Sequence, residues 1–107
     1  MYRAIVVSIM AFISTAVTDI AIAESNYLGG NFSNITSAGV GLMIMLDSGI
    51  PTNCAGTPYN WILIKEENKT MIALAMTMWA KKETCATVYT APVGGSGYCT
   101  VTQLDPC

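Results

Sequence analysis

Residues 61–82, with the sequence WILIKEENKTMIALAMTMWAKK, are the stretch that decides the fold. The first four of them are all apolar, which is typical of a short strand buried on both faces. Charged residues end this strand, and Asn68 then stands where a helix N-cap is expected. The run 69–82 contains no glycine or proline, and the lysines at its end suit the negative end of a helix dipole. The stretch therefore predicts a strand followed by a helix over residues 69–82.

The expected helix is apolar on almost every side. Its apolar residues form two adjacent stripes at helical spacing: Ile72, Ala75, Met76 and Trp79 in one, and Met71, Leu74 and Met78 in the other. A helix of this kind is buried on most sides, but a domain of this size can rarely cover one completely. Three interpretations stay open: the helix packs as ordinary core on one sheet, it plugs a small barrel, or another copy of the chain covers part of it. The last predicts a homo-oligomer formed through helix 69–82.

Strands are expected on both sides of this stretch. Residues 38–46 alternate with apolar residues on both faces, which predicts a strand. Residues 85–90 and 98–104 also alternate, and the glycine-rich run 91–97 between them predicts a β-hairpin. Residues 24–37 are polar and contain Gly29-Gly30, so they are expected to form a loose arm or an irregular edge segment. This order of elements predicts a small α+β domain with an antiparallel sheet packed on one apolar helix.

The first 23 residues have the three-part layout of a secretory signal peptide. Arg3 precedes an apolar run over residues 4–13, and Ala21-Ile22-Ala23 forms an A-x-A cleavage signature. The apolar run is short of the roughly 20 residues that span a bilayer, so an N-terminal membrane anchor is the less favoured alternative. We therefore expect a signal peptide over residues 1–23, a single domain over residues 24–107, and a secreted or periplasmic protein with no stable membrane span in its mature part.

All four cysteines, Cys54, Cys85, Cys99 and Cys107, lie after the expected leader, which indicates a disulfide framework. They show no C-x-x-C spacing and the sequence has no histidine, so neither a zinc site nor a redox-active pair is expected. Four cysteines allow three connectivities. The hairpin favours Cys85–Cys107, because the chain after residue 104 returns toward Cys85, and Cys99 is then left to hold the Cys54 loop.

The composition excludes several classes of function. A chain of 107 residues with five basic and seven acidic side chains has no basic cluster that would bind nucleic acid. The lack of histidine removes Ser-His-Asp and Cys-His catalysis. Glu66 and Glu67 are adjacent and therefore point in different directions, so they are expected to be solvated charges near the helix start rather than paired catalytic carboxylates. The sequence predicts no catalytic residue, no metal site and no cofactor, with a small hydrolase as a distant alternative.

Four aromatic residues near the expected loops are the candidates for ligand binding. They are Tyr59, Trp61, Tyr89 and Tyr98, and asparagine, threonine and serine residues lie close to them in the sequence. Amphipathic rings beside such neighbours suit contacts with sugars or proteins. The alternative is that these rings are ordinary core and strand residues.

The cysteine, strand and helix pattern of residues 54–105 resembles a group of short exported bacterial proteins that carry no known activity. The features that carry the resemblance are Cys54 ahead of Trp61, the apolar helix, and the run Gly95-Ser96-Gly97-Tyr98-Cys99. It covers about half of the chain and supports the pairing of Cys54 with Cys99. The order of elements is also similar to that of the binding subunits of AB5-type toxins, which implies a partly open OB-like barrel. That similarity concerns element order alone, so no sugar-binding residue is carried over.

These observations predict an exported, non-catalytic interaction module that self-associates and binds a ligand such as a glycan. The alternative is a monomeric protein-binding or inhibitory module of the cell envelope.

Overall fold

The computed structural model describes residues 24–107, so the expected signal peptide over residues 1–23 lies outside the described residues. The elements follow in the order β1 (Tyr27–Ala38), β2 (Gly41–Leu46), the 3-10 turns η3 (Thr52–Cys54) and η4 (Pro58–Asn60), β3 (Ile62–Lys65), α2 (Lys69–Lys81), β4 (Cys85–Ala91) and β5 (Cys99–Pro106). The expected α+β class is confirmed. No helix within residues 24–107 has the length and apolar character needed to cross a membrane.

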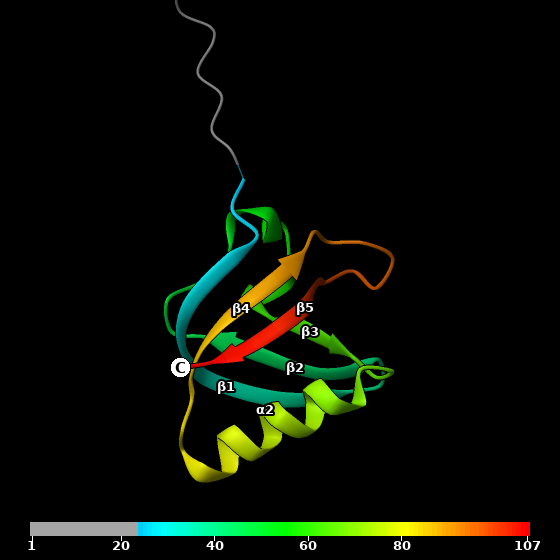
Figure 1. Cartoon of the computed structure of the whole chain (residues 1–107). Helices are drawn as coiled ribbons and strands as arrows, with labels where there is room; N and C mark the ends of the chain where they lie inside the picture. The colour runs from blue at the N-terminus through cyan, green and yellow to red at the C-terminus, as the bar shows by residue number, and fades with distance from the viewer. Residues whose placement is uncertain (1–23) are drawn as a thin grey trace, which may run out of the picture.

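The five strands pair in the order β1-β2-β3-β5-β4, and β1 also pairs with β4, so the sheet closes into a barrel (Figure 1). Strands β3 and β5 run parallel, with Ile62 beside Cys99 and Leu63 beside Thr100. The expectation of an antiparallel sheet is therefore wrong at this pair. The physical reason is the crossover through α2 and β4, which brings the chain back beside β3 in the same direction.

The first strand is the largest departure from the sequence expectations, which placed a loose arm or an irregular edge segment over residues 24–37. β1 has 12 residues, and its register shifts between Phe32 and Asn34. Residues 27–31 pair with β4 and residues 32–38 pair with β2, so one bent strand closes the barrel. Few of its side chains are apolar. Backbone hydrogen bonds to two neighbouring strands stabilise β1 in place of a strong apolar pattern.

The barrel interior is filled by the inward-facing side chains of all five strands, and α2 covers one end of it (Figure 1). The buried core consists of Phe32, Leu42, Ile44, Leu46, Ile62, Ile64, Ala75, Met78, Ala86, Val88, Val101 and Leu104. In α2 only Ala75 and Met78 are buried, while Met71 and Ile72 are partly buried against the same core. The buried line therefore runs between the two stripes expected from the sequence.

The outer side of α2 is not covered by the rest of residues 24–107. Met76 is 54% exposed, Trp79 is 39% exposed and Leu74 is 36% exposed. The end of a five-stranded barrel is narrow, so one line of helical side chains fills it and the other apolar residues face outward. Asn68 stands at the N-cap as expected, although its side chain makes no capping hydrogen bond.

Both expected disulfides are confirmed. Cys54–Cys99 is buried, with Cα atoms 5.2 Å apart, and it joins the loop after β2 to the start of β5. Cys85–Cys107 is exposed, with Cα atoms 5.5 Å apart, and it joins the start of β4 to the segment after β5. The β4–β5 hairpin is antiparallel, as the glycine-rich turn predicted.

Candidate functional site

Two loops meet at the end of the barrel opposite α2 (Figure 1). The Cys54–Cys99 disulfide links them covalently, and Thr57 adds a hydrogen-bonded link beside it. The Thr57 hydroxyl donates to the carbonyl of Trp61 at 2.7 Å and accepts from the amide of Cys99 at 3.1 Å. This end of the barrel is therefore a fixed platform despite its irregular backbone.

Three of the four aromatic residues expected to bind a ligand lie at this platform. Tyr59 is 86% exposed and has a φ of 52°, in the left-handed region, as does Asn60 with a φ of 63°. Trp61 and Tyr98 are half-buried, and they directly precede the residues at which β3 pairs with β5. Sequence proximity to the loops identified these three rings together, and the parallel strand pair brings Trp61 and Tyr98 to one end of the barrel.

Tyr89, the fourth expected residue, lies apart from the other three. It sits within β4 and pairs with Tyr27 of β1. The two ring centroids are 5.7 Å apart and the rings are tilted by 34°. The sequence does not point to Tyr27, because the polar, glycine-containing run 24–37 predicts a loose arm or an irregular edge segment. The signal that could have found it is the alternation of Leu28 with Gly30 and Phe32 on one face, which places Tyr27 on the other.

A polar network fixes the chain just ahead of Tyr27. The Asn53 amide nitrogen donates to the carbonyl of Thr90 at 2.9 Å, and the Thr90 hydroxyl donates to the Asn53 side-chain oxygen at 2.7 Å. The Thr90 amide donates to the carbonyl of Asn26 at 2.8 Å. Because Asn26 and Thr90 each adjoin one tyrosine of the pair, this network holds the strands beneath both rings.

The outer side of α2 borders an apolar groove against β1 and β2. The groove has a volume of about 340 Å³, and its lining includes Ile35, Leu42, Met76 and Trp79. None of the residues that line it is charged. An uncharged, apolar groove beside an exposed helix face has the character of a protein contact surface.

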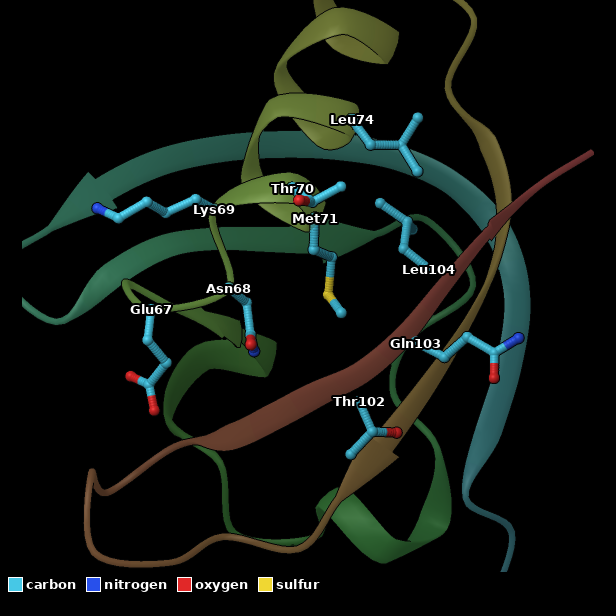
Figure 2. Close-up of a pocket in the computed structure, with 9 residues that line it drawn as sticks. All are labelled: Glu67, Asn68, Lys69, Thr70, Met71, Leu74, Thr102, Gln103 and Leu104. Atoms are coloured by element: carbon cyan, nitrogen blue, oxygen red, sulfur yellow. The ribbon is translucent and has the colours of Figure 1, made fainter.

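A second groove lies between the start of α2 and β5, with a volume of about 450 Å³ (Figure 2). Figure 2 shows Met71, Leu74 and Leu104 gathered in its apolar part, while Glu67 and Lys69 extend outward on the other side. Its lining therefore changes from apolar to charged across a short distance. Glu66 and Glu67 are both exposed, as expected of solvated charges near a helix start.

The features of residues 24–107 that could contact a partner are thus two sets of aromatic rings and one apolar helix face. Within these residues no group of three or more histidine, cysteine, aspartate or glutamate side chains is placed to hold a metal ion. Comparisons with protein-family models, curated proteins and solved structures find no match to this chain.

Proposed function

We propose that this protein is an exported, non-catalytic interaction module that associates with further copies of itself through α2 and binds a glycan. The observation that carries the proposal is the exposed apolar face of α2, where Met76 and Trp79 stand in solvent. Two disulfides within one small domain suit an oxidising, extracellular type of environment, which supports export to the periplasm or beyond.

A second copy of the chain is the occupant that suits this helix face. The closed strand pairing leaves no long free edge, so association by strand addition is disfavoured and side-chain contacts have to hold the copies together. A symmetric contact places the same patch on itself, which would repel if the patch were charged. The groove beside Met76 and Trp79 is lined by uncharged residues, so it is compatible with such self-pairing.

Native mass spectrometry and analytical ultracentrifugation of the oxidised chain test the association. We expect an oligomer for the natural sequence and a monomer for Met76→Glu, which places a charge in the contact. Thr70→Glu is the matched control, because Thr70 is exposed on the same helix and lies outside the groove of Met76. A natural chain that stays monomeric at all accessible concentrations would refute the association.

The glycan part of the proposal is supported by the barrel and its rings. We propose that the barrel is OB-like, on the basis of its five-stranded closed pairing with α2 between β3 and β4. Barrels of that type bind oligosaccharides or oligonucleotides at their surface, and the lack of a basic cluster favours the former here. A glycan array probed with the labelled, oxidised protein tests this part, and a blank array would contradict it.

A monomeric protein-binding or inhibitory module is the second candidate, and one observation favours it. Tyr59 projects from a disulfide-fixed loop in a left-handed conformation, and rigid exposed tyrosines are frequent anchors of protein interfaces. Pull-down from envelope extracts with the natural chain and with Tyr59→Ala separates the two candidates. Specific capture by a monomer that depends on Tyr59 would favour this second function.

A further inference from the structure

We propose that the glycan site is the outer surface of β1, β4 and β5 around Tyr27 and Tyr89, and that it binds one uncharged pyranose ring. This inference rests on the proposed glycan function and assigns the site and the sugar class to it. The surface, called the tyrosine face below, has two rows across three strands: Tyr27, Tyr89 and Gln103 in the first, and Gly29, Thr87 and Asp105 in the second.

Strand register places all six residues on the outside of the barrel. Residues directly opposite one another in an antiparallel ladder share one face of the sheet. Leu28, Val88 and Leu104, which stand between the two rows along each strand, point into the core, and Val88 is fully buried. The three strands lie side by side in Figure 1, so the rows form a continuous surface.

The paired rings provide an apolar base. Their centroids are 5.7 Å apart with a tilt of 34°, and Tyr27 is 53% exposed. The C–H groups on one side of a pyranose carry partial positive charge and pack against the negative face of an aromatic ring. A tyrosine pair held by two strands presents such a face without any rearrangement, so little ordering of side chains is needed on binding.

Gly29 leaves an open position directly beside the rings. A Cβ atom placed there would meet the Thr87 hydroxyl oxygen at 3.7 Å and the Ala86 carbonyl oxygen at 3.9 Å, which are ordinary contacts. Gly29 is exposed and its φ is not in the left-handed region. Nothing in the backbone therefore demands glycine, and the missing side chain lowers the surface next to Tyr27 where a sugar ring can lie.

Polar side chains around this lowered position are available for sugar hydroxyls. Among the hydrogen bonds formed within residues 24–107, none uses the side chain of Thr87, Gln103 or Asp105. In Figure 2 the Gln103 amide points away from Met71 and the core side of β5. Together these groups supply a hydroxyl, an amide and a carboxylate, which can both donate to and accept from a polyhydroxylated ring.

The charge of the tyrosine face selects an uncharged sugar. Asp105 is its one charged residue. None of the lysines after residue 23 belongs to the two rows: Lys65 ends β3, Lys69 and Lys81 lie on α2, and Lys82 lines a pocket with Glu83 and Pro106 beyond the end of the second row. A sialic acid, uronic acid or sulfated sugar would bring a second negative charge to Asp105, and the six residues of the face include no cation to offset it. The face thus suits a neutral hexose.

The test is saturation-transfer and titration NMR of the oxidised chain with methyl glycosides of glucose, galactose, mannose and N-acetylglucosamine, beside glucuronic acid and sialic acid. We expect binding of at least one neutral glycoside at about millimolar strength and at least tenfold weaker binding of the acids. Tyr27→Ala and Gly29→Val should each weaken the neutral sugar about tenfold, and Tyr27→Phe should retain most of the affinity because it keeps the ring.

Tyr59→Ala is the matched control, since it removes an exposed tyrosine that lies outside the tyrosine face. Retained binding in Tyr59→Ala with loss in Tyr27→Ala supports the tyrosine face. The reverse pattern overturns it but leaves the glycan function standing, whereas a natural chain that binds none of the glycosides and no array glycan overturns both. An unchanged melting temperature of the Gly29→Val variant shows that any loss of sugar binding does not result from a loss of folding.

Discussion

Thr57 connects three parts of the barrel through a single hydroxyl. It is one of two buried polar side chains in the described part of the chain, and its hydroxyl bonds both Trp61 and Cys99. Without that oxygen, a backbone carbonyl and a backbone amide next to the buried disulfide would lose their partners. An unpaired polar group in such a position costs more than the hydrogen bond itself contributes.

Thr57→Val should therefore lower the free energy of unfolding by about 1–3 kcal/mol, as measured by urea denaturation of the oxidised chain. Thr102→Val is the control, because Thr102 is an exposed strand residue and its side chain makes no hydrogen bond within residues 24–107. Its expected change is within about 0.5 kcal/mol. Equal effects of the two substitutions would show that the hydroxyl of Thr57 has no special role.

The two glycine positions of the β1–β2 turn differ sharply in whether they can accept a side chain. Gly41 has a φ of 145°, and a Cβ there would collide with the carbonyl oxygen of Ile64 and lie 2.9 Å from the amide nitrogen of Glu66. Gly39 has nothing within 4 Å of such an atom. Gly41→Ala should cost about 1–3 kcal/mol of unfolding free energy, while Gly39→Ala should be neutral or slightly stabilising. Thermal unfolding of the two variants side by side decides this.

At the scale of elements, α2 has to fit a barrel end with one line of side chains. Ala75 is fully buried, whereas Ala73 is exposed two positions earlier on the same helix. Sequence periodicity predicts the helix but does not single out its buried line, because an almost uniformly apolar helix carries no contrast between its faces. The packing partner decides which face is buried, and that partner is distant in the chain.

The substitutions Ala75→Leu and Ala73→Leu test which face of α2 is buried. Extra volume at Ala75 overfills the core and should lower the free energy of unfolding by about 1–3 kcal/mol. The same change at Ala73 extends into solvent and should stay within about 0.5 kcal/mol. Guanidinium unfolding at low protein concentration, where association does not contribute, gives both values. A larger loss at Ala73 would reverse the assigned orientation of α2.

Local patterns predicted the strongest elements, and long-range pairing accounts for the differences. The apolar run before Lys65, the helix and the β4–β5 hairpin were predictable because each has its own periodicity or turn signal. β1 was not, because its alternation is mostly polar. The parallel β3–β5 pair was not predictable either, because no local signal reports which strands become neighbours. Because β1 is not predictable, neither is the position of Tyr27 on it, nor the pairing of the Tyr27 ring with that of Tyr89.

At the scale of the whole molecule, the two disulfides close loops of different length and differ in burial. Cys54–Cys99 spans 45 positions and is buried, whereas Cys85–Cys107 spans 22 positions and is exposed. In the chain-entropy model the first contributes about 4 kcal/mol and the second about 3 kcal/mol. The Cys54→Ala/Cys99→Ala variant should thus unfold at lower urea concentration than Cys85→Ala/Cys107→Ala.

The difference in exposure should also decide which of the two disulfides is reduced first. Limited dithiothreitol treatment followed by alkylation and peptide mass spectrometry should label Cys85 and Cys107 first, since a thiolate must reach the sulfur atom that it attacks. Early labelling of Cys54 would instead indicate that the loop end of the barrel opens readily.

The bent first strand also affects the order in which the strand pairs of the barrel form during folding. The strands of the β1–β2 pair and of the β4–β5 pair are neighbours in the chain, so each hairpin can close quickly. The pairing of Asn31 with Cys85 forms later, because β2, β3 and α2 lie between these two residues in the sequence. During synthesis the front half of β1 is made early, and although Asp47 and Ser48 can bond Asn31 and Gly29, it has no strand partner until β4 is made. The contacts between β1 and β4 join segments that are far apart in the sequence, so we expect them to be among the last contacts of the barrel to form.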